Sequence, residues 1–318
     1  MADGSRPGSC SLWSGSGYRQ TVSLTSAPSS QKTVRQAVDA IGRLEQLDAV
    51  GEQLERLLRP RLESGGLRNA LSGVWLGHRL HPMLTDVAIG AFAGAALVDV
   101  LAPRHPQIAR RLIAAGVTAA LPTAASGMSD WIDVYGDARR IGLVHAAGNS
   151  LALGLYGISF LHRGRRHKAS DRHGGGRLSS FAGLAVLAAT GYLGGHLSYV
   201  LGIGVDHTAF QPPIEDWTDV AAAEEVLEGG HKLVRAGEVE VLLTRGEGEL
   251  RAMANRCSHA GWALDPGKFE DGCVTCPAHG SRFCLDDGSV VRGPAASPQP
   301  VFEVRARDGR VEVRSRRS

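Results

Sequence analysis

The chain has 318 residues, a formal net charge of +3 and 21% charged residues. This length allows two or three domains, and so small a net charge gives no reason to expect nucleic-acid binding. Of its five cysteines, four lie between residues 257 and 284, which is not the spread-out framework of a disulfide-stapled secreted domain. Function must therefore be sought in local motifs.

The chain begins with two segments of different character. Residues 1–33 are rich in Ser, Gly and Thr, include Cys10, and lack both a secretory signal and a twin-arginine pair, so we expect them to be disordered. Residues 34–79 form an amphipathic helical segment, because apolar residues recur at three- and four-residue spacing over 34–63. We expect this helix to pack on a neighbouring element. A helix lying on a membrane surface is the alternative.

Residues 80–207 contain four apolar segments, at 82–103, 112–129, 141–161 and 178–205. Each is close to the roughly 17–25 residues needed to cross a bilayer. Their many Gly and Ala residues suit close helix packing in lipid. A soluble four-helix bundle would need polar faces, which these segments scarcely have. We therefore predict a multi-pass, four-helix transmembrane bundle in contact with the lipid bilayer.

Three histidines are associated with these segments: His81 at the start of the first, His145 near the start of the third and His196 in the last third of the fourth. Because successive helices alternate in direction, all three should lie at similar depth near one membrane face. Ionisable side chains inside a membrane are candidates for function, and imidazoles on facing helices can ligate haem iron. Haem b, a quinol or quinone site, and a purely structural role remain open alternatives.

Basic residues are distributed unequally between the two faces of the predicted bundle. One face carries Arg104, Arg110 and Arg111 in one loop, and Arg163, Arg165, Arg166, Lys168, Arg172 and Arg177 in the other. The opposite face has only Arg139 and Arg140 in its single loop, with Arg68 and Arg79 upstream. Because positive charge stays inside, this pattern favours a non-cytoplasmic position for the domain that follows the fourth segment. The missing export signal is evidence for the other orientation.

The C-terminal part, residues 213–318, follows Gln211-Pro-Pro213 and alternates apolar with polar residues, as in 239–243 and 301–305. Asp308-Gly309 between two such stretches is a hairpin turn signal. These patterns predict a small antiparallel β domain. The whole chain is then a multidomain α + β protein, in which the transmembrane bundle precedes the β domain.

Two short pairs of metal-ligating residues lie in this domain, Cys257-Ser-His259 and Cys276-Pro-Ala-His279. Two thiolates and two imidazoles are the ligand set of a Rieske-type [2Fe–2S] cluster, which carries one electron. A structural zinc site is the alternative, although this spacing is not usual for zinc fingers. Cys273 forms a Cys-x-x-Cys pair with Cys276, but we expect Cys273 and Cys284 to be small apolar residues beside the cluster loops.

These motifs resemble the Rieske family over residues 213–318. The resemblance implies that Cys257 and Cys276 bind one iron and that His259 and His279 bind the other. It also implies that the Ser281 hydroxyl donates a hydrogen bond to a cluster sulfur.

Departures from the family pattern are equally informative. High-potential members of the family have a disulfide where this chain has Trp262 and Ala278, and a tyrosine where it has Phe283. Fewer donors to the cluster destabilise its reduced, more negative form, so we expect a low or intermediate potential.

The membrane block resembles an uncharacterised four-helix membrane domain family that is sometimes joined to a Rieske domain. The resemblance is carried by His81-Pro82, by Gly127 with Asp130, and by the run from His145 to Asn149. This resemblance implies an architecture and no particular activity.

Together these features predict a membrane-anchored protein that transfers single electrons between a membrane donor, quinol or haem, and a redox partner protein. A Rieske oxygenase needs a second, mononuclear iron, which in that family is held by a large domain after the Rieske part. Fewer than forty residues follow His279, and none is histidine. We therefore expect an electron-transfer component of an oxidoreductase and not an oxygenase. A redox sensor whose cluster state alters a membrane partner is the alternative.

Overall fold

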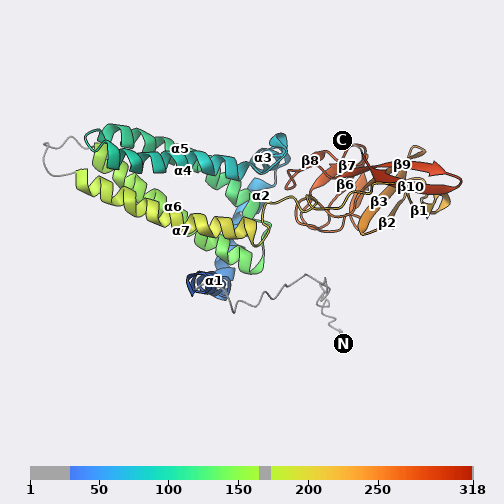
Figure 1. Ribbon diagram of the computed structural model, residues 1–318, viewed down its shortest axis with the longest axis horizontal. Coiled ribbons are helices and arrows are strands. Elements are labelled where there is room, and N and C mark those ends of the chain that lie inside the picture. Colours follow the sequence, from blue (N-terminus) through green and yellow to red (C-terminus); the bar gives the residue numbers. More distant parts are fainter. Residues whose placement is uncertain (1–28, 165–172, 317–318) are drawn as a thin grey trace, which may run out of the picture.

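The computed structural model describes residues 29–164 and 173–316, which form a helical half and a β half placed end to end (Figure 1). Nearly all of the predicted tail 1–33 lies outside these residues. The basic residues between 165 and 172 also lie outside them. The prediction of a helical bundle followed by an antiparallel β domain is confirmed.

The helical half begins with three helices that do not have the length of membrane spans. They are α1 (Ser29–Gly42), α2 (Asp48–Leu62) and α3 (Gly65–Ser72), with short 3₁₀ helices at Glu45–Leu47 and Val74–Leu76. Residues 34–63 therefore form two helices and not the single helix that we predicted. The break follows from a tertiary contact, because Arg140 Nη1 donates to the Gly42 carbonyl at 2.7 Å and ends α1 against the start of α6.

The amphipathic segment packs only in part. Val38 of α1 is buried in a cluster with Ile141 and Leu193 of the bundle, as the packing prediction requires. Two apolar side chains of α2, Val50 and Leu57, remain 49% and 53% exposed. The α2 helix thus keeps apolar side chains on its outer surface, beside the end of the bundle.

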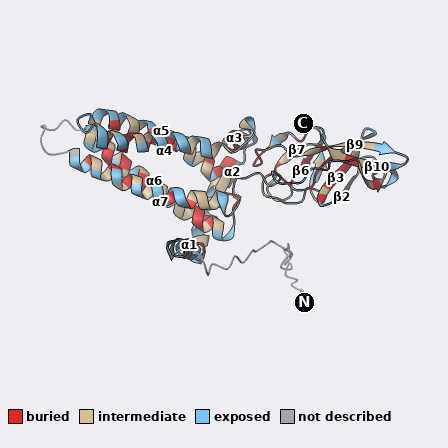
Figure 2. Cartoon of the chain, viewed as in Figure 1, coloured by how far each residue is buried: buried red, intermediate tan, exposed pale blue. Residues whose placement is uncertain are grey.

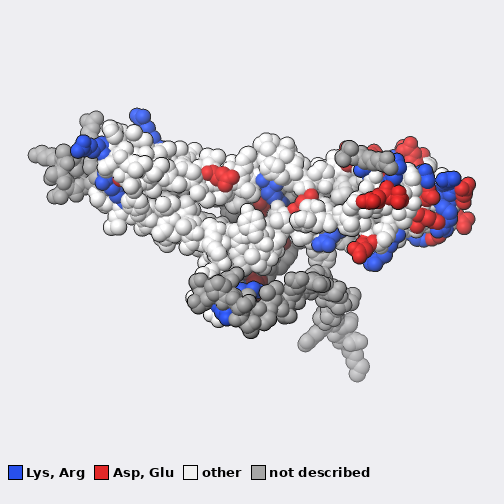
Figure 3. Space-filling model, viewed as in Figure 1, with Lys and Arg blue, Asp and Glu red and all other residues white. Residues whose placement is uncertain are grey.

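Four long helices form the bundle: α4 (Leu80–Leu101), α5 (Pro106–Trp131), α6 (Gly136–Gly164) and α7 (His173–Tyr199). All four are long and apolar enough to cross a membrane. Large apolar side chains such as Leu101, Leu121 and Leu178 point outward and are about 70% exposed, whereas small residues such as Ala95 and Ala109 are fully buried. Figure 2 shows the buried residues along the inner helix faces, and Figure 3 shows few charges along the bundle. Such a surface suits lipid.

Buried ion pairs fix both ends of the bundle. At the end nearer the β half, Arg68 pairs with Asp133 and both side chains are almost fully buried. At the far end, Arg163 forms a two-pronged pair with Asp99, at 2.7 and 2.5 Å, and both side chains are again buried. Each pair joins segments that are distant in the sequence, so the bundle ends are defined by tertiary contacts.

The β half contains two antiparallel sheets. The larger has the order β1-β10-β9-β4-β3-β2 and the smaller has the order β5-β6-β7-β8. The strands are β1 (Thr218–Ala222), β2 (His231–Ala236), β3 (Val239–Gly246), β4 (Glu249–Ala254), β5 (Lys268–Glu270), β6 (Cys273–Thr275), β7 (Arg282–Cys284), β8 (Val290–Arg292), β9 (Val301–Arg307) and β10 (Arg310–Ser315). A core with Leu242, Met253, Val274 and Phe283 fully or almost fully buried lies beside the predicted ligand loops and holds them in place.

Candidate metal centre

Two loops with the same backbone geometry carry the predicted ligands. One follows β4 and the other joins β6 to β7. In the first, the Gly261 amide donates to the Cys257 carbonyl at 2.8 Å, and in the second the Gly280 amide donates to the Cys276 carbonyl at 3.0 Å. Both glycines have positive φ, 75° and 73°, a conformation that other residues rarely adopt. These two glycines are therefore required by the turns that present Cys and His.

The four predicted ligand side chains form two pairs across the loops. The Cys257 and Cys276 thiols are buried and hydrogen-bonded to each other, which raises the pKa of Cys257 and lowers that of Cys276 to about 7. The rings of His259 and His279 lie edge to face, with centroids 4.9 Å apart. Thus the two sulfurs are in contact with each other, and so are the two imidazoles.

The chemistry of these side chains fits a cluster with two irons. His259 Nδ1 and His279 Nδ1 are buried and have no hydrogen-bond partner within the described ranges 29–164 and 173–316. An unsatisfied buried nitrogen costs about 1–3 kcal/mol, which an iron ligand bond would offset. Burial lowers the pKa of both imidazoles and keeps them neutral, as metal ligation requires.

Zinc fits this arrangement less well than a cluster does. Among the described residues, no group of three or more His, Cys, Asp or Glu side chains is placed to hold a single ion. A tetrahedral zinc site needs four such groups around one point. In a [2Fe–2S] cluster the two thiolates and the two imidazoles bind different irons, so they need not converge on one centre.

The comparisons with known proteins agree with this geometry. A model of the Rieske [2Fe-2S] domain matches residues 216–303, and a model described as Predicted membrane protein (DUF2231) matches residues 77–207. The anthranilate 1,2-dioxygenase ferredoxin subunit of Burkholderia cepacia is 34% identical over 100 residues, which cover 31% of this chain and 93% of that protein. The chain belongs to the Rieske family.

The Rieske domain is similar to proteins of two kinds. The cytochrome b6-f complex iron-sulfur subunit of Chlorobaculum tepidum is 28% identical over 94 residues, which cover 30% of this chain and 51% of that subunit. Among solved structures, the ferredoxin of carbazole 1,9a-dioxygenase from Nocardioides aromaticivorans IC177 matches with 25% identity and a TM-score of 0.31, covering 32% of this chain and all of that one. The two family models confirm a Rieske domain joined to a membrane domain.

Two buried amides that we did not predict hold the first ligand loop of the Rieske domain. Gln299 accepts from the Ser258 amide at 3.0 Å and donates to two backbone carbonyls before Cys257. Asn255 accepts from the amides of Leu264 and Asp265, and closes the same loop. Both side chains are almost fully buried. A polar residue inside an apolar stretch was the available signal for Asn255, whereas Gln299 lies some forty positions from the loop it supports.

Ser281, which the resemblance places beside the cluster, is held in a fixed position. Its side chain is fully buried, and its Oγ accepts a hydrogen bond from the Ala295 amide at 2.9 Å. The hydroxyl hydrogen is then free to donate, as the family resemblance implies. Phe283, where high-potential members have tyrosine, is fully buried in the core beside the cluster loops.

We expect Ser281→Ala to lower the midpoint potential of the cluster. A donor to a cluster sulfur stabilises the reduced form more than the oxidised form. If that difference is about 1 kcal/mol, the one-electron potential falls by roughly 40 mV. Protein-film voltammetry or an EPR-monitored titration measures the shift. Ser289→Ala, in an exposed turn, serves as the matched control, and an unchanged potential in Ser281→Ala would contradict the role.

The membrane histidines occupy equivalent places in two helical hairpins. His81 of α4 bonds through Nδ1 to the Thr123 carbonyl of α5 at 3.0 Å, and His145 of α6 bonds to the Thr190 carbonyl of α7 at 2.8 Å. A Cβ four residues beyond each threonine, at Gly127 or Gly194, would meet the histidine ring at 2.8 or 3.0 Å. Each ring therefore fills the space above a glycine and ties the two helices of its hairpin together.

The structure provides no support for a haem site at these residues. The second ring nitrogen of His145 is bonded to Asn149 Nδ2 at 3.0 Å, so neither of its nitrogens is available to ligate iron. His196 is half-buried in the last turn of α7, and in the described part of the chain no hydrogen bond links it to His81 or His145. The three lie at one end of the bundle as predicted, but they do not form one site.

The histidine edge of the Rieske domain faces the end of the bundle. The Tyr135 ring, in the turn between α5 and α6, stacks on His279 with centroids 6.1 Å apart. On the other side, His259 and Arg79 line a cavity of about 170 Å³ between the two domains. Arg79 forms a 2.7 Å ion pair with Asp130 of α5. The charged end of the membrane domain thus lies directly beside the two candidate histidine ligands.

Helix α3 holds this docked position, which sequence analysis did not predict. Asn69 Nδ2 donates to the Val291 carbonyl at 3.0 Å, and Asn69 Oδ1 accepts from the Gly293 amide at 2.9 Å. One side chain thereby pairs with the backbone beside β8 in the way a neighbouring strand would. A second contact, from the His207 amide to the Ser258 carbonyl at 3.0 Å, joins the linker to the first ligand loop.

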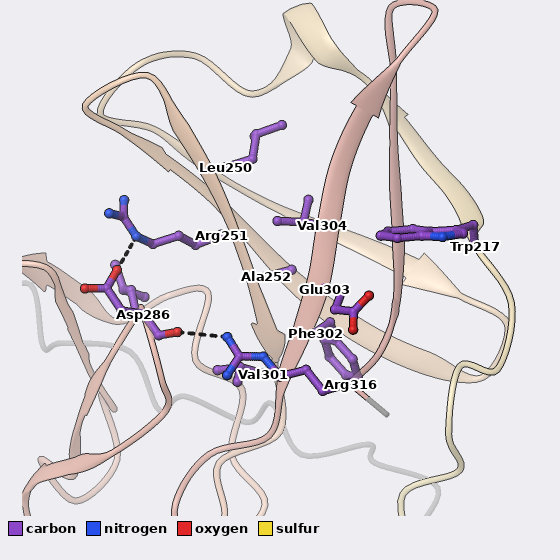
Figure 4. Close-up of a pocket in the computed structure, with 11 residues that line it drawn as sticks. Trp217, Leu250, Arg251, Ala252, Asp286, Val301, Phe302, Glu303, Val304 and Arg316 are labelled. Carbon is purple, nitrogen blue, oxygen red and sulfur yellow. Dashed lines mark hydrogen bonds and ion pairs between the residues drawn. The ribbon is translucent and has the colours of Figure 1, made fainter. Parts of the chain in front are cut away.

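A second hollow, of about 320 Å³, lies on the β half away from the ligand loops (Figure 4). Arg251 and Arg316 both reach Asp286 there, through its carboxylate and its carbonyl. Trp217 at the rim lies under two guanidinium groups, those of Arg305 and Arg314. These contacts already pair the main charged groups that line the hollow, so we do not assign a ligand to it.

Proposed function

We propose that the protein is a membrane-anchored one-electron carrier whose cluster receives electrons at the end of its own membrane domain and passes them to a redox partner protein. The observation that carries this proposal is the position of His259 and His279, which face the bundle through Arg79 and Tyr135. This position would bring the histidine-bound iron of a Rieske cluster next to the end of the membrane domain. When bound, the cluster supplies the one-electron chemistry.

The cavity beside His259 is the best-supported place for a membrane donor. Its wall contains His78, Arg79 and Asp206, which offer both hydrogen-bond donors and acceptors, and the ring edge of His259. A quinol headgroup is a small ring with two hydroxyl groups that such side chains can orient. Helices α4 and α7, which are long and apolar enough to cross a membrane, each have one end near this cavity. We therefore propose quinol as donor and move the site from His145, whose nitrogens are both engaged, to this cavity.

We expect Arg79→Gln, combined with Asp130→Asn, to slow reduction of the cluster by a short-chain benzoquinol about tenfold or more. The second substitution avoids leaving the partly buried carboxylate of Asp130 without its partner. Loss of an orienting donor costs about 1.4 kcal/mol or more, which corresponds to this factor. Stopped-flow absorbance of the full-length protein in liposomes measures the rate.

Arg104→Gln, at the opposite end of the bundle, is the matched control and should leave the rate unchanged. The EPR spectrum of the double variant should match that of the native protein, which shows that the cluster itself is intact. Equal rates in the double variant and the native protein would contradict the donor cavity. If native protein is not reduced by quinol at all, the redox-sensor alternative is favoured.

We further propose that the Rieske domain lies on the non-cytoplasmic face. Beside the loops at the far end the chain carries Arg104, Arg110, Arg111, Arg163, Arg165, Arg166, Lys168, Arg172 and Arg177. The single loop at the Rieske end carries Arg139 and Arg140, with Arg68 and Arg79 before the first span and Arg56 and Arg61 of α2 further upstream. Because the rule counts basic residues near the ends of the spans, whether or not they pair with carboxylates, this distribution supports the far end as the cytoplasmic face.

Reporter fusions should show this orientation directly. A reporter between α4 and α5, at Arg104, should report the cytoplasm, as should one in the 163–177 loop. A reporter after the last residue should report the other side. If the two positions are swapped, the charge argument fails. If both report the same side, the count of four spans is wrong.

A further inference from the structure

Cys273 and Cys284 lie directly opposite each other on neighbouring antiparallel strands, β6 and β7. In the same register, the next pair along the strands is Gly272 and Leu285. This pair is hydrogen-bonded, because the Leu285 amide donates to the Gly272 carbonyl at 2.9 Å. Hydrogen-bonded and non-hydrogen-bonded pairs alternate along an antiparallel ladder. Cys273 and Cys284 therefore occupy a non-hydrogen-bonded pair, where the Cα atoms are about 4.5 Å apart and the side chains are closest. This separation lies within the range that a disulfide bridges, about 4.4–6.8 Å.

Both thiols point away from the cluster. Side chains alternate along a strand, so Cys273 and Cys284 share one face of the hairpin, while Val274 and Phe283 occupy the other and pack in the core beside Cys276. The Cys-x-x-Cys motif thus does not form a dithiol, because Cys273 and Cys276 lie on opposite faces. A bond between Cys273 and Cys284 would leave the cluster ligands in place.

The two cysteines differ in exposure. Cys284 is partly exposed, whereas Cys273 is 7% exposed and donates its thiol hydrogen to the Asp271 carbonyl at 3.4 Å. Both are free thiols. An oxidant from solution would react with Cys284 first, and Cys273 is placed to react next with the oxidised sulfur of Cys284. This is the arrangement of a reactive thiol with a resolving thiol beside it.

We propose that Cys273 and Cys284 form a reversible disulfide that closes the hairpin behind the second ligand loop. The oxidant is a small-molecule disulfide. Cys284 thiolate attacks one sulfur of that disulfide, releases one small thiolate and forms a mixed disulfide. Cys273 thiolate then attacks the Cys284 sulfur and releases the second small thiolate. The protein loses two electrons and two protons, and the oxidant becomes two thiols.

This bond would hold together the ends of the segment that contains Cys276 and His279. Strands β6 and β7 pair over three residues and continue into the loop through the Cys276 amide and the Ser281 carbonyl, 2.8 Å apart. Opening that loop to release iron requires the strands to separate, and a cross-link prevents this. We expect the oxidised form to lose its cluster to a chelator about tenfold more slowly than the reduced form.

The test uses the full-length holoprotein treated with oxidised glutathione, blocked with N-ethylmaleimide at acidic pH in denaturant, and digested with trypsin. Cleavage after Arg282 separates the two cysteines, so the disulfide appears as peptide 269–282 joined to peptide 283–292. Because peptide 269–282 also contains Cys276, fragmentation must show that Cys276 carries the maleimide and Cys273 does not. The expected result is this cross-linked pair, with the Rieske EPR signal unchanged. Dithiothreitol should reverse the cross-link.

Cys284→Ser should give no cross-linked pair and no slowing of cluster loss after oxidation, and Cys10→Ser should behave as the native chain. If Cys273 and Cys284 are both found alkylated after oxidation of a protein that keeps its cluster, the proposal is wrong. It is also wrong if Cys284 pairs with Cys10 or with a second chain, or if the cluster is lost before any cross-link forms.

Discussion

We expect His259→Ala to abolish the Rieske EPR signal of the protein, and His279→Ala to do the same. In the proposed Rieske site the two imidazoles supply all the protein ligands of one iron, and their rings lie edge to face with centroids 4.9 Å apart. The native protein should contain about two irons per chain. EPR of the dithionite-reduced protein, with iron and sulfide analysis, measures both quantities.

His105→Ala is the matched control, since His105 is an exposed histidine at the far end of the bundle. It should leave both the signal and the iron content unchanged. Stoichiometric zinc without iron, in protein made with ample iron, would overturn the cluster assignment. A native Rieske signal in His259→Ala would show that another residue is the ligand.

We expect Asp99→Ala to destabilise the membrane domain by about 3–5 kcal/mol. The substitution leaves the buried Arg163 guanidinium without its two-pronged partner at the far end of the bundle. Arg177 approaches the same carboxylate at 3.9 Å and also loses it. The midpoint of SDS-induced unfolding in mixed micelles should fall accordingly, while the EPR signal of undenatured protein stays unchanged because the cluster lies at the other end.

A second variant tests whether the charge or the shape matters. Replacing both partners, with Asp99→Leu and Arg163→Met, removes the pair without leaving a buried charge and should recover most of the lost stability. Loss of less than about 1 kcal/mol in Asp99→Ala would show that water reaches Arg163 and that the pair is not buried in the membrane-inserted protein.

The two loops that carry the proposed cluster ligands could be predicted because the information is local. Cys257 and His259 share one short loop, Cys276 and His279 share another, and the turn geometry of each depends on a glycine within the same few residues. The four membrane helices could be predicted for a similar reason, since length and apolar composition are properties of a continuous segment. Spacing along the chain was sufficient for both.

The contacts between distant segments could not be predicted. Arg68 and Asp133 look like ordinary surface charges in the sequence, and only the fold brings them together and buries them. Asn69 gave no signal either, because its partners lie on a strand more than two hundred residues later. The break after Gly42 depends on Arg140 of another helix. The haem alternative has no support at His145, because its ring nitrogens bond Thr190 of α7 and Asn149 of α6, and these partners could not be read from the depth of the residue alone.

The division of the bundle into two hairpins has a consequence for how the chain enters a bilayer. Each hairpin has its own internal tie, His81 to α5 in one and His145 to α7 in the other. Asp99 belongs to the first hairpin and Arg163 to the second, so neither charge is neutralised until the two hairpins meet. Before the second hairpin is synthesised, the Asp99 carboxylate at the far end of the first hairpin does not have Arg163 as a partner. We therefore expect a two-stage assembly, in which the membrane domain is complete only when the second hairpin joins the first.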